Sequence, residues 1–388
     1  LGDVYKRQVT VGSSGFKTDF ELTNNGLVDV QSGTLRLSGA FPDYSLKPLT
    51  YSSGEFRASS PTSVIEFSRG KPGLQAGASL TGSGTNLVSG AYLYATDSTP
   101  TASNLVLTGD GGGALLGPGT LTITGSGSRW SGGPITQVTL NVAPGATLTL
   151  DGGDKFFGDA KISNQAGGTI NWTSGALRTY SNYGSGGYNA GTFSNDGTFD
   201  IQGDLTWSRI NSFYGGSNHV VSLRNWGSII KSAGTGTASL GDGVLIGTVF
   251  YYGYIDLANT GLIDVRSGTL LLNSPQTFTQ DGILNTATGT SFASTTTLIN
   301  AGTISGNGTI DLYGGILFNS GKISPAGSVA AAPRGSYGVG QITINGTLAL
   351  GPSSQLMFDV LPPATPGGAA QVDRLLVTGG ITLGGSLA

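Results

Sequence analysis

Three carboxylates stand close together in the segment DGGDKFFGD, at Asp151, Asp154 and Asp159. Ca²⁺ takes about six to eight oxygen ligands, so a Gly-rich turn with several aspartates is a reasonable donor set for this ion. The segment occurs once and differs from the nonapeptide calcium repeat, which leaves a solvated turn without any cofactor as the alternative. The sequence thus predicts either a calcium site held by these three aspartates or a hydrated turn.

A second group of side chains is suited to binding. Between residues 172 and 254 the chain concentrates Trp, Tyr and Arg in Gly- and Ser-rich segments. Exposed aromatic rings beside Arg can bind sugar rings or a partner protein, whereas buried rings would pack the loops onto the fold and fill its interior. Both interpretations stay open. The candidates for a binding surface are Tyr180, Tyr183, Tyr188, Trp207, Arg209, Phe213 and Tyr214.

Catalytic groups are scarce, since the chain holds one histidine and no cysteine. Aspartates recur in the pattern Gly-x-apolar-Asp-apolar, and this repetition indicates one structural position rather than a catalytic pair. We therefore assign no catalytic residue and expect no enzyme; the alternative is a β-helix polysaccharide lyase or glycosidase. The recurring aspartates are Asp29, Asp200, Asp256, Asp264 and Asp311.

The elements that position these groups are clearest in the stretch from Asn300 to Lys322, NAGTISGNGTIDLYGGILFNSGK. It holds three apolar-alternating runs: Thr303 to Ser305, Thr309 to Tyr313, and Ile316 to Phe318. Gly and Asn bound each run, and they supply the turn conformations that end strands without steric cost. Three strands and three tight turns in roughly 19 residues predict one coil of a parallel β-helix.

This coil pattern recurs along the chain. NNGLVDVQSGTLRL at residues 24–37 returns as NTGLIDVRSGTLLL at residues 259–272. Asn opens successive units, and Asn side chains at equivalent turns of stacked coils can form a hydrogen-bond ladder. Units between Asn164 and Asn259 exceed one coil in length, so they are expected to carry loops. The ladder candidates are Asn164, Asn195, Asn225, Asn259, Asn285, Asn300 and Asn319.

Composition agrees with an all-β, right-handed parallel β-helix (a β-solenoid). The 67 glycines, 11% charged residues and single Met leave few helix formers, while apolar residues in period-2 runs can still form a core. A net charge of −3 offers no basic face, so no nucleic acid partner is expected. The residues expected to point inward are Val28, Val30, Ile263, Val265, Ile310 and Leu312.

The C-terminal segment, residues 321–388, has its own texture. It runs from Gly321-Lys322-Ile323-Ser324-Pro325 through the strand pattern of Gln341 to Leu350 and on to Val372 to Leu383. This order resembles the segment near the end of many autotransporter passenger domains: a G-x-I-S-P-G start, a T-I-x-G-x-L-x-L strand pair and a D-x-L-x-V-T-G ending. Here Ala326 is inserted in the first motif, and the linker before Ile342 is longer.

The resemblance implies a protein exported to, or released from, a Gram-negative cell surface. Its expected function is structural presentation and adhesion, and its expected partner is a glycan or a host or matrix protein. The chain would act as a monomer or as part of a fibrous assembly. Membrane attachment would occur only through a C-terminal outer-membrane barrel outside this fragment of a longer chain. We expect residues 1–8 to be a non-native leader, 9–320 a β-helix with excursion loops, and 321–388 a C-terminal β-strand module continuing the β-helix.

Overall fold

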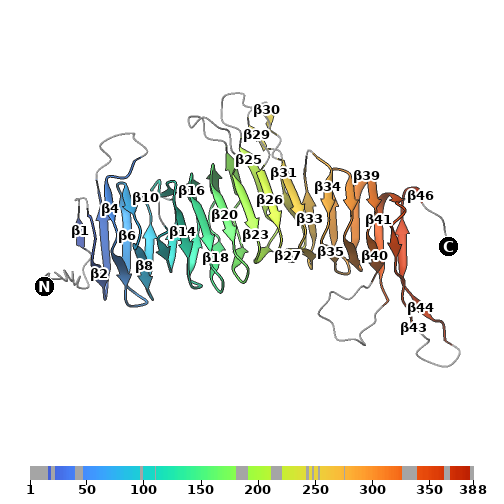
Figure 1. Cartoon of the computed structure of the whole chain (residues 1–388), viewed down its shortest axis with the longest axis horizontal. Coiled ribbons are helices and arrows are strands. Elements are labelled where there is room, and N and C mark those ends of the chain that lie inside the picture. Colours follow the sequence, from blue (N-terminus) through green and yellow to red (C-terminus); the bar gives the residue numbers. More distant parts are fainter. Residues whose placement is uncertain are drawn as a thin grey trace. The chain divides into compact units, whose positions relative to one another are not determined.

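The computed structural model describes residues 16–18, 22–39, 47–96, 99–109, 111–180, 191–210, 221–241, 244–246, 249–251, 254–274, 276–325, 339–361 and 368–384. Figure 1 shows the regular elements of this part of the chain, all of them β-strands. Within it, no helix has the length and apolar character needed to cross a membrane. The chain divides into two compact units, described separately: unit 1 holds residues 1–193 and 211–219, and unit 2 holds residues 194–210 and 220–388.

Unit 1 has three faces of parallel strands, and the chain visits them in turn. The first face is β1 (Phe16–Thr18), β3 (Thr34–Ser38), β6 (Val64–Arg69), β9 (Thr85–Val88), β12 (Leu105–Leu107), β15 (Ser128–Trp130), β18 (Thr147–Leu150) and β21 (Thr169–Trp172). The second is β4 (Thr50–Ser52), β7 (Pro72–Leu74), β10 (Tyr92–Ala95), β13 (Ala114–Leu116), β16 (Gly133–Thr136), β19 (Lys155–Gly158) and β22 (Leu177–Tyr180). The third is β2 (Leu27–Val30), β5 (Glu55–Ala58), β8 (Ser79–Gly82), β11 (Thr101–Ala102), β14 (Thr120–Ile123), β17 (Thr139–Val142) and β20 (Lys161–Asn164). The boundary between the units falls within β23 (Thr192–Asn195).

Unit 2 also has three parallel faces. Its first face is β24 (Thr198–Gln202), β27 (Ser228–Ala233), β32 (Leu262–Val265), β35 (Ile283–Thr286), β38 (Thr303–Gly306), β40 (Lys322–Pro325) and β42 (Gln355–Leu356). The second is β25 (Thr206–Ile210), β28 (Thr237–Leu240), β33 (Thr269–Leu272), β36 (Ser291–Ser294), the first parts of β39 (Thr309–Asn319) and β41 (Gln341–Leu350), and β45 (Arg374–Val377). The third is β26 (Val221–Asn225), β31 (Ile255–Asn259), β34 (Phe278–Gln280), β37 (Leu298–Asn300), the last parts of β39 and β41, and β46 (Ile381–Leu383). Two antiparallel hairpins branch off: β29 (Val244–Ile246) with β30 (Val249–Tyr251), and β43 (Val360–Leu361) with β44 (Gln371–Val372).

The core of each unit lies inside its coils, because alternation sends every second side chain of a strand inward. In β18, for example, Leu148 and Leu150 are buried while the threonines between them are half-buried. The prediction of an all-β, right-handed parallel β-helix is confirmed. The six residues expected to point inward are all buried: Val28, Val30, Ile263, Val265, Ile310 and Leu312.

The coil that begins at Asn300 has the predicted three runs, with one difference. β38 forms the first run, but the second and third belong to one strand element, β39, which bends at Tyr313 and Gly314. Before the bend β39 pairs with β36, and after it β39 pairs with β37. The bend therefore lets one stretch of chain serve two faces of the same coil.

The recurring aspartates do not share one position, which corrects the prediction from the pattern. Within unit 2, Asp200 and Asp264 lie on the first face, because both are in register with Ile230. Asp256 lies on the third face in β31, and Asp311 lies on the second face in β39. The Gly-x-apolar-Asp-apolar pattern thus marks any strand that follows a tight turn, since all three faces impose the same alternation.

Candidate functional site

The predicted aspartate cluster forms the corner between β18 and β19 in unit 1. Asp151 accepts hydrogen bonds from two side chains of the preceding coil: Arg129 Nε at 2.7 Å and Ser131 Oγ at 2.5 Å. Asp154 accepts from the following coil instead, through Arg178 Nε at 2.6 Å and the backbone N–H of Ala176 at 3.0 Å. The two carboxylates therefore face opposite neighbours and tie three successive coils together.

Electrostatics at this corner favour the ionised carboxylate. Burial alone would raise the pKa of Asp154, but the hydrogen bonds from Arg178 and from the Ala176 N–H outweigh it and lower the pKa. Asp159 lies beyond β19 with a left-handed backbone, at φ 51°. Among the described residues no three acidic or histidine side chains gather as a metal-ligand set. Calcium binding by Asp151, Asp154 and Asp159 stays a prediction of the sequence, beside the alternative of a hydrated turn.

Lys155 is the group at this corner that the sequence did not single out. Its side chain is fully buried, and Nζ donates to the carbonyl oxygens of Gly153 at 2.8 Å and Ser174 at 2.6 Å. Burial lowers the pKa of Lys155 to about 8, although the charges of Asp151 and Asp154 oppose that shift. A lysine with such a pKa is more nucleophilic than usual, but this one is enclosed and joins two coils.

Tryptophans make the same kind of contact in the adjacent coils. Trp130 Nε1 donates to the Gly133 carbonyl at 3.0 Å, and Trp172 Nε1 donates to the Gly175 carbonyl at 2.8 Å. Both indoles are buried at the end of a first-face strand. A buried carbonyl group needs a hydrogen-bond donor. At this corner the long Trp and Lys side chains reach from the coil interior and donate to the carbonyl oxygens of the turns.

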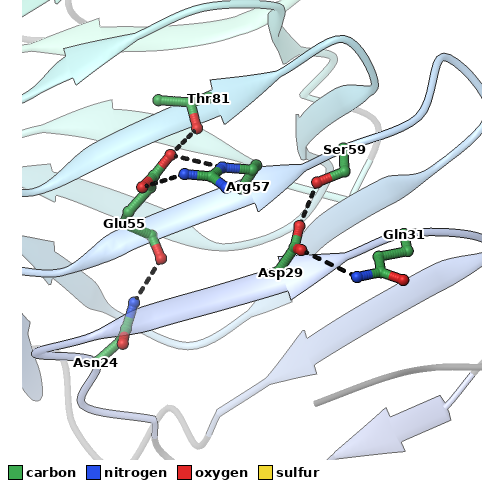
Figure 2. A network of polar contacts seen from close by, with 7 residues as sticks. All are labelled: Asn24, Asp29, Gln31, Glu55, Arg57, Ser59 and Thr81. Carbon is green, nitrogen blue, oxygen red and sulfur yellow. Dashed lines mark hydrogen bonds and ion pairs between the residues drawn. The ribbon is translucent and has the colours of Figure 1, made fainter. Parts of the chain in front are cut away.

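A second polar network covers the outer side of the third face of unit 1, and Figure 2 shows its members on β2, β5 and β8 and directly beside the ends of β2 and β5. Glu55 accepts two hydrogen bonds from Arg57, at 2.9 and 2.8 Å, and a third from Thr81 Oγ1 at 2.5 Å. Asp29 accepts from Ser59 Oγ on the next coil and from Gln31 Nε2 at 3.4 Å. Both carboxylates are thus held by neighbouring coils.

The charges within this network stabilise each other. The hydrogen bonds and charge of Arg57, with the Thr81 hydroxyl, lower the pKa of Glu55 despite partial burial, and Glu55 in turn raises the pKa of Arg57. A general acid needs a raised carboxyl pKa, so Glu55 is poorly suited to that role. Asn24 closes the edge of the network by donating from Nδ2 to the Glu55 carbonyl at 2.9 Å.

Few of the predicted aromatic binding residues can be placed. Tyr180 and Arg209 lie in strands β22 and β25 without a described side chain, and Tyr183, Tyr188, Phe213 and Tyr214 fall outside the described residues. Trp207 is fully buried and pairs in register with the buried Leu240, so its assignment to an exposed surface is wrong. Strand alternation in β25 sends this ring into the coil.

Other aromatic side chains are exposed in unit 2. Trp226 is 54% exposed, Tyr313 is 63% exposed and Phe318 is 45% exposed. The exposure of Phe318 could have been predicted from the sequence. Strand alternation between the inward Leu317 and the ladder residue Asn319 points the Phe318 side chain outward. The exposure of Tyr313 could not have been predicted, because it follows from the bend in β39.

A ladder of buried amides lines the corner between the third and first faces of unit 2. Four of its members donate a side-chain N–H to the side-chain amide oxygen of the next coil: Asn195 to Asn225 at 2.7 Å, Asn225 to Asn259 at 2.6 Å, Asn259 to Gln280 at 2.6 Å, and Asn300 to Asn319 at 2.6 Å. The predicted ladder is confirmed at these asparagines. Asn285 was wrongly included, since it lies in β35 and donates to Asp264; Gln280 holds that rung instead.

A glycine stands two residues after each amide residue of the ladder in the sequence. A Cβ on Gly261 would lie 2.1 Å from the carbonyl oxygen of Gly227, and a Cβ on Gly227 would lie 2.1 Å from that of Gly197. Neither distance is sterically possible for a real side chain, so the motif Asn-x-Gly combines a ladder amide with a turn that must stack closely.

The comparisons with known proteins give no further assignment. No protein-family model matches the chain, and the searches of curated proteins and of solved structures give no match either.

Proposed function

We propose that the chain is an exported passenger domain of a bacterial surface protein, whose coils present adhesive side chains to a glycan or to a host or matrix protein. The observation that supports this most is the use of its charged groups. Each ion pair described here joins residues two positions apart in the sequence or residues of adjacent coils within a unit, so these charges stabilise the stack of coils. They are Arg36–Glu66, Glu55–Arg57, Arg129–Asp151, Asp154–Arg178, Asp204–Lys231, Arg224–Asp256 and Asp264–Arg266.

Lys231 in unit 2 is a clear instance of this use. Its side chain is fully buried, and Nζ donates to Asp204 Oδ1 at 3.1 Å and to the carbonyl oxygens of Ala233 at 2.8 Å and Gly234 at 3.1 Å. The ammonium group thereby has three acceptors within two adjacent coils, which offsets the cost of burying its charge.

The alternative of a polysaccharide lyase or glycosidase draws on Asp29, Glu55 and Arg57, which share one outer face (Figure 2). Two features weigh against it. Among the residues that the structure describes, the carboxyl groups with a shifted pKa are Glu55, Asp154 and Asp204, and all three pKa values are lowered, whereas the general acid of glycoside hydrolysis needs a raised pKa. A cavity of about 30 Å³ near this region is lined by the inward Phe56 and Phe67 rather than by the acidic side chains.

Export and surface location are part of the same proposal. A chain without cysteine can cross an envelope without forming unwanted disulfides, and this chain has none. The C-terminal segment that resembles autotransporter passengers continues the parallel stack in unit 2, with β40 paired to β38 and β41 paired to β39. This continuity agrees with a passenger domain displayed at, or released from, an outer membrane.

The proposal is tested by comparing attachment with catalysis in one preparation. Beads coated with the chain are incubated with surfaces carrying matrix proteins or immobilised glycans, and the same protein is incubated with soluble extracellular polysaccharides. Attachment above that of uncoated beads, with no release of new reducing or unsaturated ends, supports the proposal. Polysaccharide cleavage without attachment would replace it with the enzyme.

A further inference from the structure

β39 exposes two aromatic rings and one aliphatic side chain on the outside of one coil: Tyr313 stands at the bend, and Ile316 and Phe318 lie in the third-face part that follows it. Tyr313 is 63% exposed, Phe318 is 45% exposed and Ile316 is 37% exposed. Between them the chain turns through Gly314, whose φ is 82° and beside which a Cβ would meet nothing. The outward side of β39 therefore carries large rings next to open space.

The backbone at Tyr313 has a conformation that a tyrosine adopts rarely. Its φ is 51°, in the left-handed region that glycine or asparagine occupies at lower cost. Residues held in such regions cluster at ligand-binding positions, where the side chain is needed in spite of the backbone. Because the Tyr313 ring is largely exposed, packing into the core does not explain why tyrosine stands there.

A polar ladder beside the bend holds this conformation and runs across adjacent coils. Asp311 Oδ1 accepts the backbone N–H of Tyr313 at 3.0 Å and Asn345 Nδ2 at 2.9 Å. Thr378 Oγ1 then donates to Asn345 Oδ1 at 3.0 Å. These contacts lie at the exposed surface, and neither bond to Asp311 uses its Oδ2. The ladder thus presents fixed carboxylate, amide and hydroxyl groups at strand spacing.

We propose that Tyr313, with Asp311 and Asn345 beside it on the second face, forms a glycan-binding site; the inference rests on the adhesive function proposed above and names its ligand class. A sugar ring has an apolar face of C–H groups and a rim of adjacent hydroxyl groups. An exposed aromatic ring fits the face, and prepositioned carboxylate and amide groups fit the hydroxyls. A purely apolar partner would cover the Asp311 carboxylate without supplying a hydrogen-bond donor to Oδ2, which favours a glycan over a hydrophobic protein surface.

The test uses the full chain on an array of immobilised plant, bacterial and animal oligosaccharides, followed by calorimetric titration with the strongest binder in soluble form. Tyr313→Gly removes the ring and fits the left-handed backbone, so its melting temperature should equal or exceed that of the parent. Its affinity should fall at least tenfold, whereas Phe318→Ser, which removes an exposed ring on the third face of the same coil, should leave the affinity unchanged. The matched control is Tyr51→Ser, which removes a ring that is 43% exposed on β4 of unit 1 and should leave binding unchanged.

Several outcomes would overturn the inference. Equal binding by the parent and Tyr313→Gly would remove the site, and a Tyr313→Gly variant that melts well below the parent would make the ring structural. If the parent binds no oligosaccharide but its beads still attach to matrix protein, the glycan assignment fails while adhesion stands. If neither attachment nor sugar binding is seen, both proposals fail.

Discussion

The side-chain amide of Asn225 donates a 2.6 Å hydrogen bond to Oδ1 of Asn259, which lies 34 residues later in the sequence and one coil further along unit 2. Asn225 Nδ2 also donates to the Leu262 carbonyl at 3.0 Å, and its own oxygen accepts from Asn195. Both residues are 1% exposed. Such a buried amide specifies how coils align, because a slipped register would leave its donors and acceptors unpaired.

Replacing Asn225 by Ala should therefore destabilise unit 2. The substitution leaves the Asn195 amide without its acceptor and Asn259 Oδ1 without its donor, which should lower the free energy of unfolding by about 2–4 kcal/mol. Urea denaturation followed by circular dichroism measures the change. The exposed turn residue Asp281, replaced by Ala, serves as the control and should shift stability by less than about 0.5 kcal/mol. Equal effects of the two substitutions would mean that the ladder does not stabilise the fold.

The close stacking of glycines makes a separate prediction. Gly261→Ala places a methyl group where the Gly227 carbonyl lies 2.1 Å away, so the coils must move apart locally at a cost of about 2–4 kcal/mol. Gly380→Ala is the matched change, because a Cβ there meets nothing. Thermal melting of both variants checks the prediction; a Gly261→Ala protein that melts with the parent would contradict the described stacking.

The inner face of β39 can be tested on a single strand. Ile310 is fully buried, whereas Ile316 in the same strand is 37% exposed. An aspartate at position 310 would be a buried charge without a partner, so Ile310→Asp should cost at least about 3 kcal/mol. Ile316→Asp should cost under about 1 kcal/mol because water can reach the carboxylate. Similar denaturation midpoints for the two variants would show that the inward assignment is wrong.

Lys155 should make stability depend on pH above neutrality. Its pKa is about 8 in the folded protein and near the ordinary 10.5 when unfolded. Between these values the unfolded chain binds more protons, so stability should rise with pH from about 8 to 10.5, by roughly 1–3 kcal/mol, and be lowest below pH 8. Titrations of other groups cancel in the difference between the parent and Lys155→Met. That difference should change across the window; a constant difference would refute the shifted pKa.

Much of the fold could be predicted from sequence, because strand alternation and Gly-bounded turns are local signals. The inward Ile310 and the rung Asn225 follow from such patterns. Gln280 could not be predicted as a ladder residue, because the sequence pattern marks ladder positions by Asn. Only the stacking of the coils shows that Gln280 occupies the ladder position after Asn259. Trp207 was misplaced because a Gly- and Ser-rich context indicated a loop. The Lys155 corner and the Tyr313 bend depend on contacts between coils and on backbone geometry, neither of which a single sequence displays.

We propose that the acidic groups of the outer faces stabilise the stack of coils and that the chain binds its partner without catalysing a reaction. The most direct measurement is the attachment of beads coated with the variant Asp29→Asn/Glu55→Gln, alongside release of new sugar ends from soluble polysaccharide by parent and variant. Neutralising both carboxylates of the Figure 2 network should lower the melting temperature modestly, leave attachment at the parental level, and reveal no cleavage in either protein. Cleavage by the parent that disappears in the variant would contradict this proposal and assign these carboxylates to an enzyme.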